Sequence, residues 1–176
     1  MKSELRKFAL QKRKELDVNT LSKKVLDNLF QFDEYKNAKN ILCYFPLKYE
    51  IQTQTCFSDA SKTWYLPRVN VDELEVCKYE PTKLSKGNFN IQEPTNDKVL
   101  NLDFLDMVII PCVAADKKGY RIGYGKGYYD RFLPTLSNSC KKVILVYSDL
   151  LFDSVYPSDF DIKSDFVVTD KEICRI

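Results

Sequence analysis

The sequence predicts an α/β fold, with one three-layer αβα domain over residues 1–176 and a mostly parallel, Rossmann-like central sheet. Short apolar segments alternate along the chain with helical segments, which is typical of proteins built from strand–helix–strand units. Apolar residues make up 44% and charged residues 30% of the chain, as in ordinary globular proteins. The length of 176 residues is sufficient for one well-buried core.

Two helices are expected at the start of the chain. Residues 2–16 are predicted to form an amphipathic helix, with Lys and Arg on its other faces. Its stripe at helical spacing is Leu5, Phe8, Ala9, Lys12 and Leu16. A second helix begins after a cap at Asp17 or Asn19. Its apolar stripe is Leu21, Val25, Leu26, Leu29 and Phe32.

Strands are expected wherever a short apolar or alternating segment is bounded by proline or polar residues. They are predicted at residues 41–45, 63–66, 74–79, 107–110, 143–147 and 166–168. Prolines 46, 67 and 111 end three of these strands, and Pro134 ends a helix predicted at 128–133. A short helix is expected near 53–60. Residues 81–101 are polar and are predicted to be an extended surface segment.

Composition excludes several classes of function. The chain has no histidine, which excludes Ser-His-Asp and Cys-His catalysis and histidine-ligated zinc. Its net charge of +2 argues against a nucleic-acid partner, and it has no apolar segment long enough to cross a membrane. The six cysteines are widely spaced, which favours free thiols and a cytoplasmic location. We expect a monomer or weak dimer.

Four of the five glycines lie within nine residues, between a predicted strand and a predicted helix. This glycine loop contains Gly119, Gly123, Gly125 and Gly127, interleaved with Arg121, Lys126 and Arg131. Glycine is needed where φ is positive or where another group approaches the backbone closely. Free amides beside fixed positive charge predict an anion site, most naturally for phosphate.

The spacing of the glycine loop matches neither common phosphate motif. Tyr120 and the Gly125-Lys126-Gly127 sequence rule out the Walker A pattern, and the G-x-G-x-G spacing rules out the dinucleotide fingerprint. Two alternatives remain open at this point. The glycines could form a tight turn without a ligand, or the mixture of Arg, Lys and Tyr could bind RNA.

The residues from Arg121 to Arg131, Arg-Ile-Gly-Tyr-Gly-Lys-Gly-Tyr-Tyr-Asp-Arg, resemble the signature loop of 5-formyltetrahydrofolate cyclo-ligases. The resemblance extends over nearly the whole chain, from the Lys2-to-Arg6 segment to Val167-Val168-Thr169. One departure is Cys112, where many members have glycine. The implied topology is that of the cyclo-ligase family.

The resemblance implies an enzyme that uses ATP and Mg²⁺ to convert 5-formyltetrahydrofolate, with or without a polyglutamate tail, to 5,10-methenyltetrahydrofolate. The formyl oxygen attacks the γ-phosphate, N10 of the folate captures the resulting imidate phosphate, and ADP and phosphate leave. Such chemistry needs positioning and charge stabilisation rather than a protein nucleophile. The chain's lack of histidine is therefore compatible with it.

The resemblance also implies roles for individual residues. Lys126 and Arg121 are the expected catalytic residues. The expected ATP-binding residues are Lys2, Arg6, Arg121, Ile122, Gly123, Tyr124, Gly125, Lys126, Gly127, Tyr128 and Tyr129. The expected folate-binding residues are Phe45, Glu50, Tyr124, Gly125, Lys126, Gly127 and Tyr128. The expected magnesium ligands are Asp130 and Asp161.

Simpler interpretations stay open for these residues. Lys2, Arg6, Lys126 and Asp161 could be solvated surface charges, and Asp130 could complement the dipole at a helix start. Phe45 could belong to the core. For the whole chain, the alternative is a catalytically silent nucleotide- or folate-binding module that has kept the glycine loop.

Overall fold

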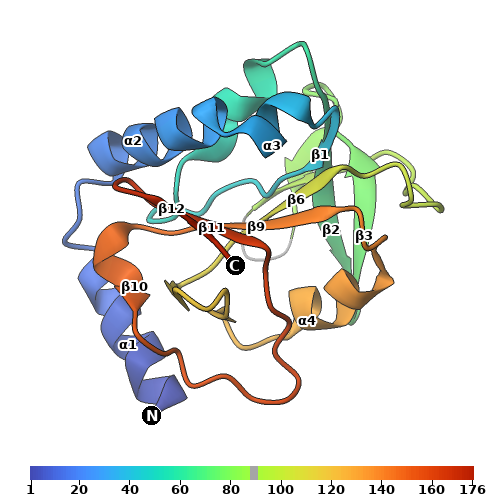
Figure 1. Ribbon diagram of the computed structural model, residues 1–176. Coiled ribbons are helices and arrows are strands. Elements are labelled where there is room, and N and C mark those ends of the chain that lie inside the picture. Colours follow the sequence, from blue (N-terminus) through green and yellow to red (C-terminus); the bar gives the residue numbers. More distant parts are fainter. Residues whose placement is uncertain (88–90) are drawn as a thin grey trace.

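The computed structural model describes residues 1–87 and 91–176, and a seven-stranded sheet runs through its centre (Figure 1). The strands lie in the order β12-β11-β9-β6-β1-β2-β3. All neighbours from β11 to β2 are parallel, and the edge strands β12 and β3 are antiparallel. The strands are β1 Asn40–Leu42, β2 Thr63–Asn70, β3 Glu73–Lys78, β6 Met107–Ile110, β9 Lys141–Leu145, β11 Phe166–Val168 and β12 Ile173–Arg175. The predicted mostly parallel α/β sheet is confirmed.

Two smaller sheets accompany the central one. The hairpin of β4 (Leu84–Lys86) and β5 (Gln92–Pro94) lies within the segment predicted to be an extended excursion. A three-stranded sheet of β7 (Ala114–Asp116), β8 (Arg121–Ile122) and β10 (Leu151–Phe152) leads into the glycine loop. These strands have two or three residues each, which is too short for a periodic pattern in the sequence.

Helices cover both faces of the central sheet, as expected. Figure 1 shows α2 (Val18–Gln31) and α3 (Asp33–Asn37) on one side, with α1 (Lys2–Arg13) and α4 (Tyr128–Phe132) on the other. Short 3₁₀ turns span Thr53–Ser58, Leu133–Thr135 and Ser148–Leu150. The cap at Asp17 is confirmed, because its side chain accepts a hydrogen bond from the Thr20 amide at 3.1 Å. Among the described residues, no helix has the length and apolar character that a bilayer crossing requires.

The orientation of α1 differs from its apolar pattern. Phe8 is 57% exposed, whereas Arg13 is only 4% exposed. Lys2, Arg6, Ala9 and Arg13 are spaced by four, three and four residues, so they share one helix face. Contacts from the three cations on this face, to Asp161, Gly123 and Cys112, show that it faces the interior of the molecule. The helix is therefore rotated relative to its apolar stripe, although Leu5, Ala9 and Leu16 of that stripe still pack on the core.

The strand end predicted at Pro67 is wrong. β2 continues through Pro67 to Asn70, because beyond Tyr65 it pairs only with β3 and Pro67 needs no second partner. The end predicted at Pro134 is confirmed, since α4 ends at Phe132 and Pro134 lies in the first turn of the 3₁₀ segment that follows. A missing amide is harmless in a first helical turn.

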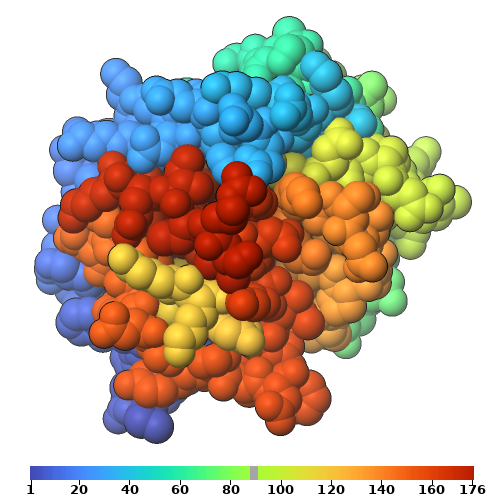
Figure 2. Space-filling view, in the orientation of Figure 1, coloured from blue at the N-terminus to red at the C-terminus, as the bar shows by residue number. Residues whose placement is uncertain are grey.

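Segments that are distant in the sequence close one face of the molecule. Figure 2 shows the C-terminal residues, in red, between the blue α2 region and a yellow segment that precedes the glycine loop. The tight turn at Gly119 has φ +88°, and a Cβ there would lie 2.7 Å from the Ser164 carbonyl oxygen. Glycine is therefore required at this position for conformation and for space.

Strand order places a crevice beside the carboxyl ends of β1 and β6. The chain adds β2 on one side of β1 and then β6 on its other side, which makes a topological switch point. Ligands bind at such points in open α/β sheets. Residues Phe45 and Glu50 follow β1, and Pro111 follows β6.

A buried ion-pair cluster fixes the β4–β5 hairpin to the central sheet. Arg68 in β2 donates to Glu75 in β3 at 2.8 Å and to the carbonyls of Pro94 and Asn96 at 3.1 and 2.8 Å. Glu75 also accepts hydrogen bonds from Asn70 and forms an ion pair with Lys98. Hydrogen bonds from Asn70, Arg68 and Lys98 lower the pKa of Glu75 to about 2.

We expect Glu75→Gln to change how stability depends on pH. Because the folded-state pKa is depressed, ionised Glu75 stabilises the fold above its usual pKa of about 4.3. That contribution is lost as pH falls towards 2. Glu75→Gln should lower the free energy of unfolding by ~1–3 kcal/mol at neutral pH. The difference in the free energy of unfolding between the variant and the unsubstituted protein should become smaller in acid, as measured by urea unfolding. The exposed Glu73→Gln is the control, and a difference that does not depend on pH would contradict the prediction.

Candidate active site

One cavity of about 550 Å³ lies at the crevice and collects most of the residues predicted for the site. The predicted residues that line it are Lys2, Arg6, Phe45, Glu50, Arg121, Gly123, Tyr124, Gly125, Lys126, Gly127, Tyr128, Tyr129, Asp130 and Asp161. Ile122 is the exception. It lies in β8 with its side chain fully buried in the core, so it does not line the cavity.

The glycine loop forms one wall of the cavity. Gly125 has φ +92° and Gly127, which precedes α4, has φ +68°, so both adopt a backbone that other residues avoid. Within the described part of the chain, the amides of Gly123, Gly125 and Gly127 donate no hydrogen bond. Amides left without a protein acceptor beside a cavity can bind an anion. This geometry supports the phosphate-binding interpretation.

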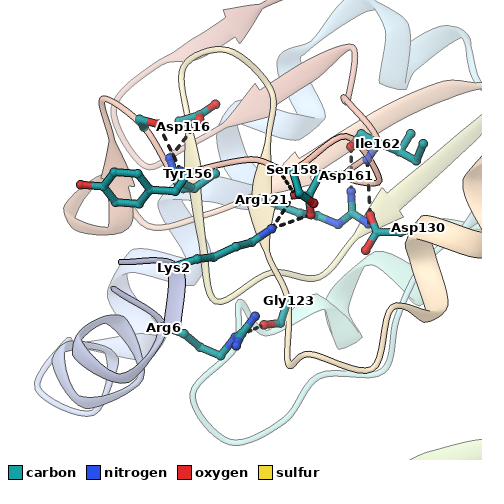
Figure 3. A network of polar contacts seen from close by, with 12 residues as sticks. Lys2, Arg6, Asp116, Arg121, Gly123, Asp130, Tyr156, Ser158, Asp161 and Ile162 are labelled. Carbon is teal, nitrogen blue, oxygen red and sulfur yellow. Dashed lines mark hydrogen bonds and ion pairs between the residues drawn. The ribbon is translucent and has the colours of Figure 1, made fainter. Parts of the chain in front are cut away.

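Cations from α1 reach the same wall. Figure 3 shows Lys2 extending to Asp161 and Arg6 to the Gly123 carbonyl. The Lys2 ammonium lies 2.6 Å from both carboxylate oxygens of Asp161, and Arg6 Nε lies 2.9 Å from the carbonyl oxygen. Lys126 lies on the exposed rim of the loop. The structure thus brings Lys126 to the same cavity as Lys2 and Arg6, which lie more than a hundred residues before it in the sequence.

Arg121 is more deeply embedded than the sequence suggests. It is 6% exposed and donates to Asp130 at 2.7 Å and to the Ile162 carbonyl at 3.0 Å. The two terminal nitrogens of its guanidinium therefore connect the start of α4 to the segment around Asp161 (Figure 3). Arg121 still lines the cavity, but its contacts within the protein are those of a residue that positions the loop.

The two predicted metal ligands, Asp130 and Asp161, differ in how many hydrogen bonds their carboxylate oxygens already accept. Asp161 accepts hydrogen bonds from Lys2, from the Ser158 amide and from the Ser158 hydroxyl. Asp130 uses Oδ1 for Arg121 and the Ile162 amide, and Oδ2 has no hydrogen-bond donor among residues 1–87 and 91–176. The same residues contain no cluster of three or more metal-binding side chains. Magnesium needs few protein carboxylates, because water and phosphate supply its other ligands, so Asp130 fits a metal better than Asp161.

The other end of the cavity is built around a buried carboxylate. Glu50 is 5% exposed, and its oxygens accept from the Leu47 amide at 2.7 Å and the Tyr124 hydroxyl at 2.8 Å. Burial raises the pKa of Glu50, and these two hydrogen bonds and the charge of Arg13 oppose that effect. Phe45 lines the cavity nearby and stacks on Phe57, with ring centroids 6.2 Å apart. A carboxylate beside an aromatic ring can bind a flat heterocycle that carries N–H donors.

Sequence reasoning missed two parts of the site. Arg13, whose guanidinium contacts Tyr124, had no signal beyond being one of many cations in the first helix. The apolar wall opposite the glycine loop comes from the central sheet edge and the β4–β5 hairpin. Its residues include Pro67, Val69, Leu74 and Ile91. Val69 could not be found because β2 was expected to end at Pro67, and Ile91 could not because residues 81–101 were expected to be a surface segment.

Comparison with known proteins gives one consistent result. The model of the 5-formyltetrahydrofolate cyclo-ligase family matches residues 1–170. The chain belongs to this family. A 5-formyltetrahydrofolate cyclo-ligase of Mycoplasma genitalium is 29% identical over 95% of this chain and 96% of its own length. The Haemophilus influenzae cyclo-ligase is 38% identical over 60% of this chain and 61% of its own.

Solved structures agree with the cyclo-ligase assignment. The NMR structure of Aquifex aeolicus 5,10-methenyltetrahydrofolate synthetase has a TM-score of 0.88 and 37% identity, and the match covers 99% of this chain and 92% of that one. The synthetase structure from Mycoplasma pneumoniae has a TM-score of 0.72 and 27% identity, over 96% of this chain and 98% of that one. Membership confirms the predicted fold and the predicted enzyme class, an ATP-dependent ligase.

We expect Tyr129→Phe to weaken neither the fold nor substrate binding. Tyr129 lines the cavity, and its hydroxyl is buried without a hydrogen-bond partner in the described residues. Leaving a buried hydroxyl unsatisfied costs about 1–3 kcal/mol, so its removal should not lower the melting temperature. The buried hydroxyl does not reach the cavity, which only the rest of the side chain lines, so the KM of each substrate should change less than about twofold, well below the ~10-fold effect of losing 1.4 kcal/mol. A lower melting temperature, or a KM raised about tenfold, would contradict the prediction.

Proposed function

We propose that this family member catalyses the ATP-dependent cyclisation of 5-formyltetrahydrofolate to 5,10-methenyltetrahydrofolate, with release of ADP and phosphate. One observation carries the proposal. A single cavity has cations and free glycine amides at one end and the buried carboxylate of Glu50 at the other. A nucleoside triphosphate and a pteridine can therefore bind next to each other in the same cavity, so the phosphoryl group can pass directly between them.

In the proposed reaction, the formyl oxygen of the folate forms a bond to the γ-phosphorus of ATP as the bond from that phosphorus to ADP breaks. N10 then attacks the activated carbon and loses its proton, and the carbon–oxygen bond breaks to release phosphate, which takes up that proton. Charge moves onto phosphate oxygens in both steps, so catalysis depends on fixed donors and cations. Lys126, Lys2, Arg6 and the glycine amides of the loop are in position to supply them.

Glu50 is proposed to bind the pteridine, because an ionised carboxylate accepts hydrogen bonds from the two N–H groups of an aminopyrimidinone edge. Phe45 lies against the same end of the cavity and can pack on the ring. Lys126 is proposed to contact the transferring phosphoryl group, because it lines the cavity and its ammonium has no ion pair among the described residues. Arg121 is paired with Asp130, and Arg131, which lies outside the cavity, donates to the Asp72 and Lys126 carbonyls. Arg121 is proposed to keep Asp130 and the loop in place.

Magnesium is part of the proposal, with Asp130 as its protein ligand. When bound, the ion would neutralise phosphate charge and orient the triphosphate. Asp161 is proposed to hold Lys2 at the phosphate end of the cavity instead of binding metal directly, because its oxygens already accept hydrogen bonds from Lys2 and Ser158.

A silent binding module is not favoured. Glu50, Lys126 and Asp130 are all present and all line one cavity. Such a module would still bind ATP but would form no product. The two possibilities differ in whether the near-ultraviolet absorption of 5,10-methenyltetrahydrofolate appears when the protein meets both substrates.

We expect that absorption to appear only when ATP, magnesium and 5-formyltetrahydrofolate are all present. Lys126→Met should lower kcat/KM by about 100-fold or more, which corresponds to losing one electrostatic contact to the transition state. Lys118→Met is the matched control, because Lys118 is an exposed lysine just before the loop and outside the cavity. No product with all components present would contradict the proposed function, and equal losses in the two variants would contradict the role of Lys126.

Asp130→Asn and Asp161→Asn should change different kinetic properties of the enzyme. If Asp130 holds the metal, Asp130→Asn should raise the magnesium concentration needed for half-maximal activity by about tenfold or more. If Asp161 acts through Lys2, Asp161→Asn should raise the KM for ATP while the magnesium requirement stays unchanged. Activity titrated with magnesium at saturating ATP measures the first effect. An unchanged requirement in Asp130→Asn would overturn the assignment.

A further inference from the structure

Arg13 is a buried cation just outside the cavity. The Tyr124 hydroxyl connects its guanidinium to the Glu50 carboxylate. Arg13 is 4% exposed at the end of α1, and Glu50 is 5% exposed. One guanidinium nitrogen donates to the Cys112 carbonyl at 2.9 Å, and the other donates to the Tyr124 hydroxyl. That hydroxyl in turn donates to Glu50 Oε1 at 2.8 Å. Arg13 does not line the cavity, so it would not touch the substrate.

The surroundings of Glu50 contain no other cation close enough to affect it among the described residues. The titratable groups that face it are Arg13, Tyr44, Cys112, Tyr124, Tyr129 and Tyr147. Burial raises the pKa of the Cys112 thiol to about 12 and raises the pKa of each tyrosine, so these groups are neutral at working pH. The hydrogen bonds from the Leu47 amide and the Tyr124 hydroxyl therefore favour the ionised Glu50 carboxylate, and Arg13 adds a positive charge to them.

Ionisation of Glu50 matters because of what it would bind. An aminopyrimidinone edge presents two N–H donors, and an ionised carboxylate offers acceptors only. A protonated Glu50 would place its own O–H against those donors. Burial favours the protonated form, so a nearly buried carboxylate at this position needs a compensating positive charge.

We propose that Arg13 is a positioning residue that keeps Glu50 ionised and holds the Tyr124 hydroxyl towards it, so that the carboxylate is ready to accept the pteridine. The proposal rests on the proposed function, in which Glu50 binds the pteridine. It assigns a role to a residue at the end of the helix whose first turns bring Lys2 and Arg6 to the phosphate end of the same cavity.

Arginine suits this position better than lysine. The planar guanidinium contacts a carbonyl and a hydroxyl at once, and it stays protonated under all working conditions. The Cys112 carbonyl fixes the guanidinium from the β6 side. Cys112 has no positive φ, so the residue that departs from the family pattern needs no glycine conformation. A lysine would keep the charge but satisfy only part of these contacts.

The test compares Arg13→Met and Arg13→Lys by the pH dependence of the KM for 5-formyltetrahydrofolate at saturating ATP and magnesium. In the unsubstituted protein, this KM should rise in acid as Glu50 takes a proton. Arg13→Met should move that rise to higher pH by about one unit or more, since a nearby opposite charge lowers a carboxyl pKa by about 1–3 units. Arg13→Lys should lie between the two, and the KM for ATP should change less than about twofold, well below the ~10-fold effect of losing 1.4 kcal/mol.

Two further variants keep the outcomes distinct. Glu50→Gln should weaken folate binding and abolish the acid rise. If it binds folate normally, the proposed role of Glu50 fails. If Glu50→Gln behaves as expected but Arg13→Met leaves the pH profile in place, the role of Arg13 fails. Should Arg13→Met not fold, Tyr124→Phe decides the point, because it removes only the bridging hydroxyl. It should shift the profile in the same direction, because the hydrogen bond from this hydroxyl also lowers the pKa of Glu50, and an unshifted profile would overturn the proposal.

Discussion

The site depends on the docking of α1 with its cationic face towards the sheet. Lys2, Arg6 and Arg13 lie on one side of that helix, and each contacts a different part of the cavity wall. Lys2 pairs with Asp161, Arg6 binds the Gly123 carbonyl, and Arg13 binds Tyr124 and the Cys112 carbonyl. The helix thus connects the C-terminal segment, the glycine loop and the end of β6. Without it, the glycine loop would lose its contacts to one side of the molecule.

Burying Arg13 and partly burying Lys2 and Arg6 costs free energy unless each cation is satisfied by hydrogen bonds. Here every cation has an oxygen partner at 2.9 Å or less. The geometry also explains why Phe8 is exposed, because an apolar residue on the opposite side of the helix has no core to enter. The cationic face therefore determines the orientation of α1, and the orientation of α1 determines where the phosphate end of the cavity lies.

The sequence predicted the architecture better than the boundaries. The apolar segments around Val108 and Ile144 are buried on both faces of a parallel sheet, so their pattern was unambiguous. The end of β2 could not be predicted, because whether Pro67 interrupts a strand depends on which neighbours that strand has.

The candidate site shows the same division between local and tertiary information. The glycine loop was readable because positive φ values at Gly125 and Gly127 restrict the residue type directly. The burial of Ile122 and the deep position of Arg121 follow from the pairing of β7 with β8, which two- and three-residue strands do not encode in a pattern. Arg13 was hidden for a related reason, since the inward face of α1 is set by its partners across the fold.

The ion pairs within the cavity indicate how the site can receive two charged substrates without a large change in its own electrostatics. Without ligands, Lys2 is neutralised by Asp161 and Arg121 by Asp130. A triphosphate would offer Lys2 a second anionic partner, and a divalent cation would offer Asp130 a second cationic one. At Lys2 and Asp130, an incoming charge thus meets a group that already has an opposite charge beside it, and binding there exchanges or shares partners. Because no isolated buried charge has to exist before ligands arrive, the fold can hold a strongly charged site while remaining stable without them.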